Sequence, residues 1–271
     1  PRGAPVSWWP AYIALGAFTG FFAGMLGIGG GLVMVPMLTM LFAAQGGFPP
    51  GEVLHIALGT SAAAIVFTSL SSLRAHHQHQ AVIWKVVARI TPGILLGTLL
   101  GTLFASSINA RPLAIFFTCF VCFVALQMVF DIKPKATREL PGALGIVATG
   151  TGIGAISSLV AIGGGSFTVP FLTWCNVPVR KAIGTSAAVG FPIALGSALG
   201  YTFNGYAHAG LPPFSLGYVY LPALAWIVPP SMLVAPFGAR VAHRVPVATL
   251  KRVFAGLLIV LAGRMLWKLF H

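Results

Sequence analysis

The chain has 271 residues, of which 57% are hydrophobic and 7% charged, and its formal net charge is +13. A soluble domain carries about 25% charged residues, so this chain has too few charges to cover a surface in water. The composition therefore excludes a soluble protein and indicates an integral membrane protein. The 16 Lys and Arg lie mostly in short segments between apolar runs, where membrane topology accounts for them without a nucleic-acid partner.

Ten apolar segments follow one another along the chain. They are too long for barrel strands and lack the alternation of such strands, so each is predicted to be a helix. The first five cover residues 9–28, 31–44, 54–73, 84–106 and 112–130, and the second five cover 142–162, 165–175, 182–201, 218–239 and 252–269. We therefore predict an all-α polytopic protein forming one membrane domain. It consists of an N-terminal repeat (1–130), a charge-dense linker (131–141) and a C-terminal repeat (142–271).

The two sets of segments match as an internal duplication. The glycines at 29–31 align with those at 163–165, and the string GTSAA occurs at both 59–63 and 184–188. Pro92 also falls on Pro229. Repetition of this kind is the sequence signature of a fold built twice from one unit.

The distribution of Lys and Arg predicts that the repeats are inverted. If each half crosses the membrane an odd number of times, twelve of these residues gather on one side and four on the other, whereas four crossings per half divide them equally. Only the first arrangement obeys the positive-inside rule. We therefore expect a cytoplasmic linker and both termini on the periplasmic side. The twelve are Arg74, Lys85, Arg89, Lys133, Lys135, Arg138, Arg180, Lys181, Arg240, Arg244, Lys251 and Arg252.

The glycine triplets interrupt apolar runs and precede unusually short segments. These segments are predicted to be half-helices or re-entrant helices starting at Gly31 and Gly165, near the middle of the membrane. A helix start carries unpaired N–H groups and a partial positive charge, and glycine lets a ligand approach the backbone. If the two starts converge, they form a site for a small anion. The alternative is a packing or hinge role. The candidate glycines are Gly29, Gly30, Gly31, Gly163, Gly164 and Gly165.

The two GTS copies could add hydroxyl donors to this site. Thr60 and Ser61 match Thr185 and Ser186, and Ser166 follows the second glycine triplet. The alternative is that these small residues only allow helices to pack closely.

At these motifs the sequence resembles the TauE/SafE family of sulfite and organosulfonate exporters. The resemblance rests on "GIGGGLVMVP", "AIGGGSFTVP" and the two GTSAA strings, and it covers nearly the whole chain. It implies export of a small sulfur oxyanion across the bacterial cytoplasmic membrane. It does not fix the substrate.

Three further side chains are candidates for gating or proton coupling. His55 and His208 lie near the outer ends of segments, and histidine changes charge near neutral pH. The alternative for both is simple interfacial placement. Arg89 could attract anions at the inner mouth, or could only extend its charge to the cytoplasm.

The sequence therefore favours a secondary transporter that works by alternating access, with one repeat rocking against the other. A passive anion channel is the first alternative. A thiol-transfer protein using Cys119 and Cys122 is the second, although packing is the favoured role for both cysteines. No enzymatic motif is present, and neither a cofactor nor a metal is expected. The expected partners are a small sulfur anion and the lipid bilayer, with a homodimer left open.

Overall fold

The computed structural model describes residues 8–26, 30–130, 138–206, 208, 210–244 and 247–270. These residues form ten helices and one short hairpin, and five of the helices are long and apolar enough to cross a membrane. The prediction of an all-α polytopic membrane protein is confirmed. The first set is α1 (Trp9–Leu26), α2 (Gly31–Gln45), α3 (Val53–Gln78), α4 (Trp84–Ser107) and α5 (Ala110–Val129). The second is α6 (Ala143–Leu159), α7 (Gly165–Trp174), α8 (Val179–Gly205), α9 (Leu221–Arg244) and α10 (Val247–Phe270).

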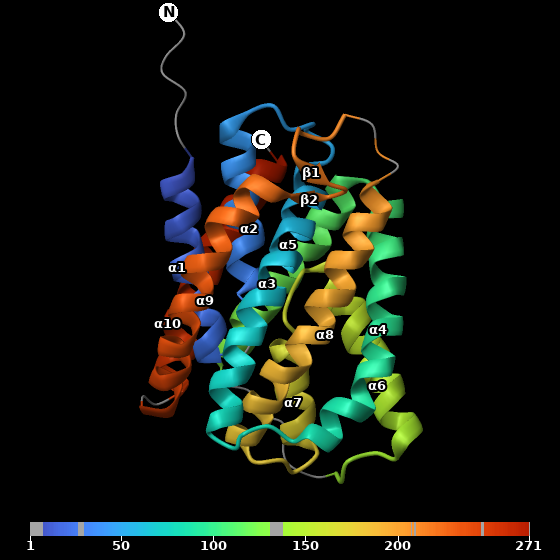
Figure 1. Ribbon diagram of the computed structural model, residues 1–271, viewed down its shortest axis with the longest axis vertical. Coiled ribbons are helices and arrows are strands. Elements are labelled where there is room, and N and C mark those ends of the chain that lie inside the picture. Colours follow the sequence, from blue (N-terminus) through green and yellow to red (C-terminus); the bar gives the residue numbers. More distant parts are fainter. Residues whose placement is uncertain are drawn as a thin grey trace, which may run out of the picture.

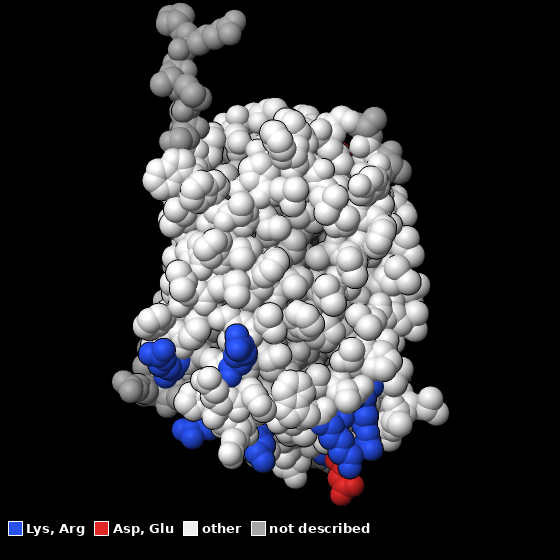
Figure 2. Space-filling view, in the orientation of Figure 1, with Lys and Arg blue, Asp and Glu red and all other residues white. Residues whose placement is uncertain are grey.

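The two sets run in opposite directions (Figure 1). Helix α1 begins at the end of the molecule that also carries the hairpin of β1 (Ser215–Leu216) and β2 (Val219–Tyr220), and α10 finishes there. We call this the hairpin end. Helix α6 begins at the opposite end, which we call the basic end because Lys and Arg gather there on the face shown in Figure 2. Lys85 and Arg89 of α4 and Arg180 and Lys181 of α8 belong to this end.

Each half of the sequence contributes one helix that packs among the helices of the other half. Helix α1 packs along α9, and α6 packs along α4, in the two most extensive helix contacts of the described structure. Glycine allows both, because a Cβ atom at Gly20 would collide with the backbone of Ser231 and one at Gly97 with the carbonyl oxygen of Thr151. Small residues at such positions bring membrane helices close enough for van der Waals packing to stabilise the pair.

The helices consequently form two bundles that do not coincide with the sequence halves. Bundle A contains α1, α2, α3 and α9, and bundle B contains α4, α6, α7 and α8. The bundles meet along α3 and α8, and α5 packs against α10. Since α4 and α9 are exchanged, motion of the halves 1–130 and 142–271 as separate bodies would break the α1–α9 and α4–α6 contacts. The rocking of one repeat against the other stays a prediction.

Candidate functional site

Two helices begin inside the protein at a glycine with a left-handed backbone. The residue before α2 is Gly30, with φ of 77°, and the residue before α7 is Gly164, with φ of 76°. Residues with a Cβ atom rarely adopt this conformation, so glycine is required at both positions. No side chain caps either helix, so the first N–H groups of each have no side-chain acceptor. The predicted short, glycine-broken helices are confirmed, while Gly29 lies outside the described residues.

The two helix starts lie close together. A Cβ atom at Gly31 would collide with the carbonyl oxygen of Ala161, which belongs to the break before α7. At Gly190 of α8, a Cβ atom would come within 2.7 Å of the carbonyl oxygen of Gly163 in the same break. From this region α2 runs towards the hairpin end and α7 towards the basic end (Figure 1). The positive ends of two half-helices therefore approach each other from opposite sides.

Buried hydroxyl groups without partners surround these breaks. Ser157, Ser166 and Thr168 flank the second break. Ser61 lies near the first break, on α3. It is one turn before Ile65, whose Cδ1 atom is 3.1 Å from the position that a Cβ atom at Gly31 would take. Relative exposures are 9% for Ser166 and 0% for the other three hydroxyl residues. A buried hydroxyl left without a hydrogen bond costs about 1–3 kcal/mol, so four of them indicate a place that receives polar groups from a ligand or water.

The threonine of each GTS string accepts a hydrogen bond from the backbone of another segment. Thr60 Oγ1 accepts a hydrogen bond from the Tyr220 N–H at 2.9 Å, and Thr185 Oγ1 accepts one from the Ile83 N–H at 3.0 Å. Tyr220 directly precedes α9 and Ile83 directly precedes α4. Each threonine thus attaches an exchanged helix to its new bundle. Ser186 bonds within its own helix, to the Ile183 carbonyl.

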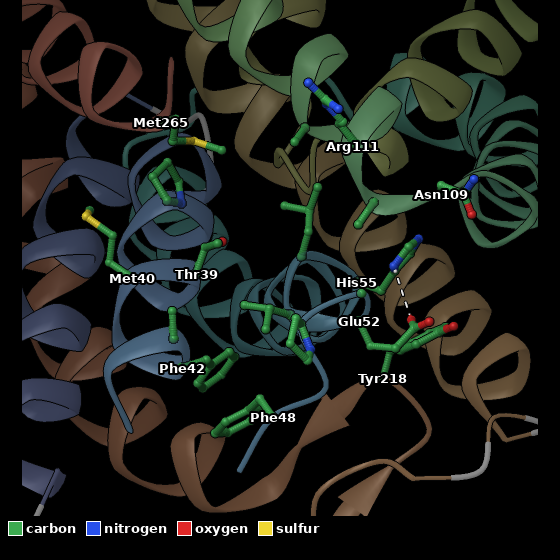
Figure 3. A pocket seen from close by; sticks show the side chains of 18 of the residues that line it. Thr39, Met40, Phe42, Phe48, Glu52, His55, Asn109, Arg111, Tyr218 and Met265 are labelled. Carbon is green, nitrogen blue, oxygen red and sulfur yellow. Dashed lines mark ion pairs between the residues drawn. The ribbon is translucent and has the colours of Figure 1, made fainter. Parts of the chain in front are cut away.

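A cavity of about 1030 Å³ opens at the hairpin end, beside residues 36–43 of α2. Its wall comes from α2, α3, the end of α4, the α4–α5 connection, α5, the hairpin and α10 (Figure 3). Charged and titratable side chains are concentrated here: Glu52, His55, Arg111, His208, Tyr218 and Arg264. The cavity is therefore a vestibule in which charged and titratable side chains come together.

The three gating candidates have different surroundings. His55 is buried, forms an ion pair with Glu52 at 3.3 Å, and its Nε2 atom lies 3.1 Å from the carbonyl oxygen of Ala105. His208 is exposed and its ring lies 5.3 Å from that of Tyr218, which also stacks on His55. Arg89 is exposed on α4, at the basic end and outside the vestibule.

Sequence reasoning missed Glu52 and Tyr218. Glu52 carried a usable signal, because it is the one acidic residue outside the linker, the others being Asp131 and Glu139. Tyr218 carried none, because its importance depends on contacts between segments far apart in the chain.

The cysteines show no paired arrangement. All three are free, with Cys119 exposed, Cys122 partly buried and Cys175 buried. The expectation that Cys119 is buried by packing is wrong, because its side chain faces outward from α5. Among the described residues, no group of three His, Cys, Asp or Glu is placed to hold a metal ion.

The two halves are inverted and interleaved, and their broken helices meet inside the protein. This is the architecture of secondary membrane transporters. Residues 12–265 match the model of the sulfite exporter TauE/SafE family, so the chain belongs to that family and the resemblance noted from its motifs is confirmed.

Relatives from both bacteria and an archaeon agree with this class. The chain is 38% identical to a probable membrane transporter protein of Haemophilus influenzae, over 94% of this chain and 97% of that protein. It is 27% identical to a probable membrane transporter protein of Methanocaldococcus jannaschii, over 95% of each chain. A third relative, from Bacillus subtilis, is also a probable membrane transporter protein, at 23% identity over 94% of this chain and 96% of that protein. No solved structure matches the chain significantly. The protein is a multi-pass membrane transporter.

Proposed function

We propose that this transporter exports a small sulfur oxyanion, sulfite or a small organosulfonate, across the bacterial cytoplasmic membrane by alternating access. The observation that supports this most directly is the meeting of two half-helix starts where Gly31 lies against Ala161. The family description names sulfite export. The basic end would then face the cytoplasm, as the positive-inside rule requires.

The helix starts suit an anion that must be released again. Each start acts as a partial positive charge of about half a unit and stabilises a nearby anion by roughly 0.3–2 kcal/mol. No Lys or Arg is among the buried polar residues of the described structure, so the site holds no full cation there. The unpartnered hydroxyls of Ser166 and Thr168 would donate hydrogen bonds to the anion's oxygens. Such a site binds through several weak donors, which allows turnover.

We take the two exchanged bundles as the moving parts. Bundle A carries the start of α2 and bundle B carries the start of α7, so the site lies between them. Sliding or rocking along the α3–α8 contact would open the site towards one end at a time. Thr60 and Thr185 would keep α9 and α4 fixed to their bundles during this motion.

The experiment that tests the proposal is flux of labelled sulfite into proteoliposomes, with sulfate, sulfoacetate and chloride as competitors. We expect saturable flux that is accelerated by sulfite on the opposite side. Ser166→Ala and Thr168→Val remove a hydroxyl with little change of volume and should raise KM by about tenfold, the loss of one hydrogen bond to a charged ligand.

The matched control is Thr149→Val. Its hydroxyl bonds to the Gly145 carbonyl within α6, so the same chemical change should leave KM unaltered. Flux that does not saturate and is indifferent to sulfite on the opposite side would identify the alternative, a passive anion channel. Absence of flux for all four anions in folded protein would contradict the anion site.

A further inference from the structure

The Glu52–His55 pair is a buried titratable group that the anion site does not use. Glu52 precedes α3 and His55 lies in its first turn, with side chains 27% and 4% exposed. Figure 3 shows the two side chains pointing toward each other at the vestibule, joined by the ion pair. Placing such a pair in an apolar protein is costly unless the pair is fully satisfied.

The geometry around His55 offers a place for a shared proton. The carbonyl oxygen of Ala105 is only an acceptor, so Nε2 of His55 must carry the hydrogen of that 3.1 Å bond. The other ring nitrogen, Nδ1, lies 3.3 Å from Glu52 Oε2, and neither of these two buried atoms has a hydrogen-bond partner. With neutral His55 and ionised Glu52, two lone pairs would lie beside each other. One further proton, on the ring or on the carboxyl group, would relieve this contact.

Removal of that proton has a definite consequence. A neutral imidazole has one N–H group for two acceptors, the Ala105 carbonyl and the Glu52 carboxylate. Hydrogen bonds to a charged acceptor are about twice as strong as neutral ones. The single ring hydrogen would therefore sit on Nδ1, facing Glu52, and no longer on Nε2. The hydrogen bond to Ala105 would be lost.

This bond joins the two bundles. His55 lies on α3 of bundle A, and Ala105 lies on α4 of bundle B. The shared proton therefore controls one of the contacts that link the bundles at the hairpin end.

The charged and titratable neighbours of the pair come from four segments around the vestibule. Tyr218, from the β1–β2 turn, lies beside the Glu52 carboxyl group, which contributes to the raised pKa of its phenol, and stacks on the His55 ring. His208 contacts Tyr218 from the α8–β1 connection. Arg111 of α5 and Arg264 of α10 line the same cavity and are both exposed, so water screens them. Helices α2 and α4 contribute no charged side chain to its lining.

The pair is not required by the fold. In the register that aligns Gly59 with Gly184, the positions matching Glu52 and His55 hold Val177 and Arg180. The second repeat forms the same helix without an acid and a histidine at its start. The pair is therefore an addition to one end of an otherwise duplicated frame.

We propose that Glu52 and His55 hold a proton that gates this transporter, and that the bound proton keeps the hairpin end closed through the His55–Ala105 bond. The proposal rests on the proposed transport function and names the group that controls one end of the transport path. Proton release into the vestibule opens the hairpin end, and rebinding from the vestibule closes it.

A labelling experiment tests the gate without a transported substrate. Ser106 lines the vestibule beside Ala105, so we place a reporter there as Ser106→Cys after replacing Cys119, Cys122 and Cys175 with serine. The purified protein is labelled with a hydrophilic maleimide between about pH 5 and about pH 9, which includes the range in which ordinary histidines change charge. Rates are divided by those of Pro213→Cys in the exposed α8–β1 connection, which corrects for the pH dependence of the reagent.

We expect the relative rate at Ser106→Cys to rise with pH by at least about fivefold, the lower end of ordinary coupling between two sites. Glu52→Gln supplies an amide N–H to Nδ1 at every pH, so it should hold the rate low throughout. His55→Gln cannot titrate and should also give a flat profile. Glu139→Gln makes the same change at a distant acid, and His208→Gln removes a neighbouring histidine, so both should keep the rise.

A flat profile in the parent protein, or a rise that survives Glu52→Gln, would overturn the proposal. Elution of each variant as a single species in size-exclusion chromatography excludes misfolding as the cause.

Flux measurements then separate this proposal from the proposed function. In proteoliposomes the parent protein should carry labelled sulfite, and Glu52→Gln, which holds the hairpin end closed at every pH, should abolish that flux. Sulfite flux with a pH-independent Ser106→Cys rate would overturn the gating proposal alone. A pH-dependent rate without flux of sulfite would overturn the substrate and leave the proton site supported.

Discussion

Thr60 and Thr185 occupy matching positions in the two repeats, and each accepts a backbone hydrogen bond from the segment that leads into an exchanged helix. The bonds are 2.9 Å from Tyr220 N and 3.0 Å from Ile83 N. At the preceding residue, a Cβ atom would approach the Tyr218 carbonyl oxygen at 2.5 Å from Gly59 and the Ala81 carbonyl oxygen at 2.5 Å from Gly184. The duplicated GTS string is therefore explained by helix exchange: glycine admits the crossing backbone and threonine holds it.

Loss of either threonine hydroxyl should destabilise the protein. Thr60→Val leaves the Tyr220 N–H buried without an acceptor, at a cost of about 1–3 kcal/mol. For a chain of this size the melting temperature should fall by roughly 2–4 °C per kcal/mol, measured by thermal unfolding in detergent. Thr185→Val should act alike, and the two effects should add because the sites lie in different bundles. Thr60→Ser keeps the hydroxyl and should recover most of the loss, whereas no recovery would contradict the hydrogen-bond explanation.

The glycine contacts between exchanged helices give a second prediction. Gly97→Ala places a Cβ atom against the Thr151 carbonyl oxygen, so α4 and α6 must separate and the yield of folded protein should drop severalfold. Gly152→Ala is the matched control, because nothing lies within 4 Å of its Cβ position. There the substitution should be neutral or stabilising by up to about 1 kcal/mol, since alanine favours helices. Equal behaviour of the two variants in size-exclusion chromatography would contradict close helix packing.

Tyr218→Phe should move the pH dependence of the hairpin-end gate. Burial and the neighbouring Glu52 carboxyl group raise the pKa of Tyr218 above its ordinary value of 10.0, so the phenol stays protonated and available to donate to that carboxyl group. Without this donor, the carboxylate attracts the shared proton more strongly. The midpoint of the Ser106→Cys labelling profile should shift to higher pH. A shift to lower pH would show that Tyr218 does not act on the carboxylate.

Membrane orientation can be tested with single cysteines. In a cysteine-free background, Pro213→Cys at the hairpin end should react with an impermeant maleimide in intact cells, and Gln78→Cys at the basic end should react only after permeabilisation. Both side chains are exposed, so access to the reagent depends on the membrane alone. The reverse labelling pattern would place the linker outside and would contradict the positive-inside assignment.

The thiol-transfer alternative makes an opposite prediction from transport. Cys119→Ser combined with Cys122→Ser should leave sulfite flux within about twofold of the parent, because neither residue lines the helix break or the vestibule and serine is nearly isosteric. Loss of all activity in this double variant, with the protein still folded, would favour thiol chemistry over anion transport.

Hydrophobicity and glycine placement allowed the helices to be predicted closely. Segments expected at 31–44 and 84–106 are helices at Gly31–Gln45 and Trp84–Ser107. The larger differences, five residues at one end, concern α3, which continues to Gln78 instead of 73, α9, which continues to Arg244 instead of 239, and α10, which begins at Val247 instead of 252. Helix α8 is also longer, covering Val179–Gly205 instead of 182–201. These helices extend beyond the apolar runs, where hydropathy no longer reports helix length.

The candidate site was predictable only in part. Gly30 and Gly164 could be identified because a left-handed backbone conformation strongly favours glycine, which is recognisable in the sequence. The hydroxyls were identifiable by type, yet nothing local distinguishes Thr60, which accepts a backbone hydrogen bond, from Ser61, which has no partner.

The sequence by itself determined the membrane class, the duplication and the direction of the repeats, because these depend on composition, local hydropathy and the one-sided distribution of Lys and Arg. Only the tertiary structure decided that α4 and α9 are exchanged and that Glu52, His55 and Tyr218 meet at one vestibule. The physical reason is that lipid requires every spanning segment to be an apolar helix and so fixes each segment separately. The choice among helix partners depends instead on contacts such as Gly97 with Thr151, between residues far apart in the chain.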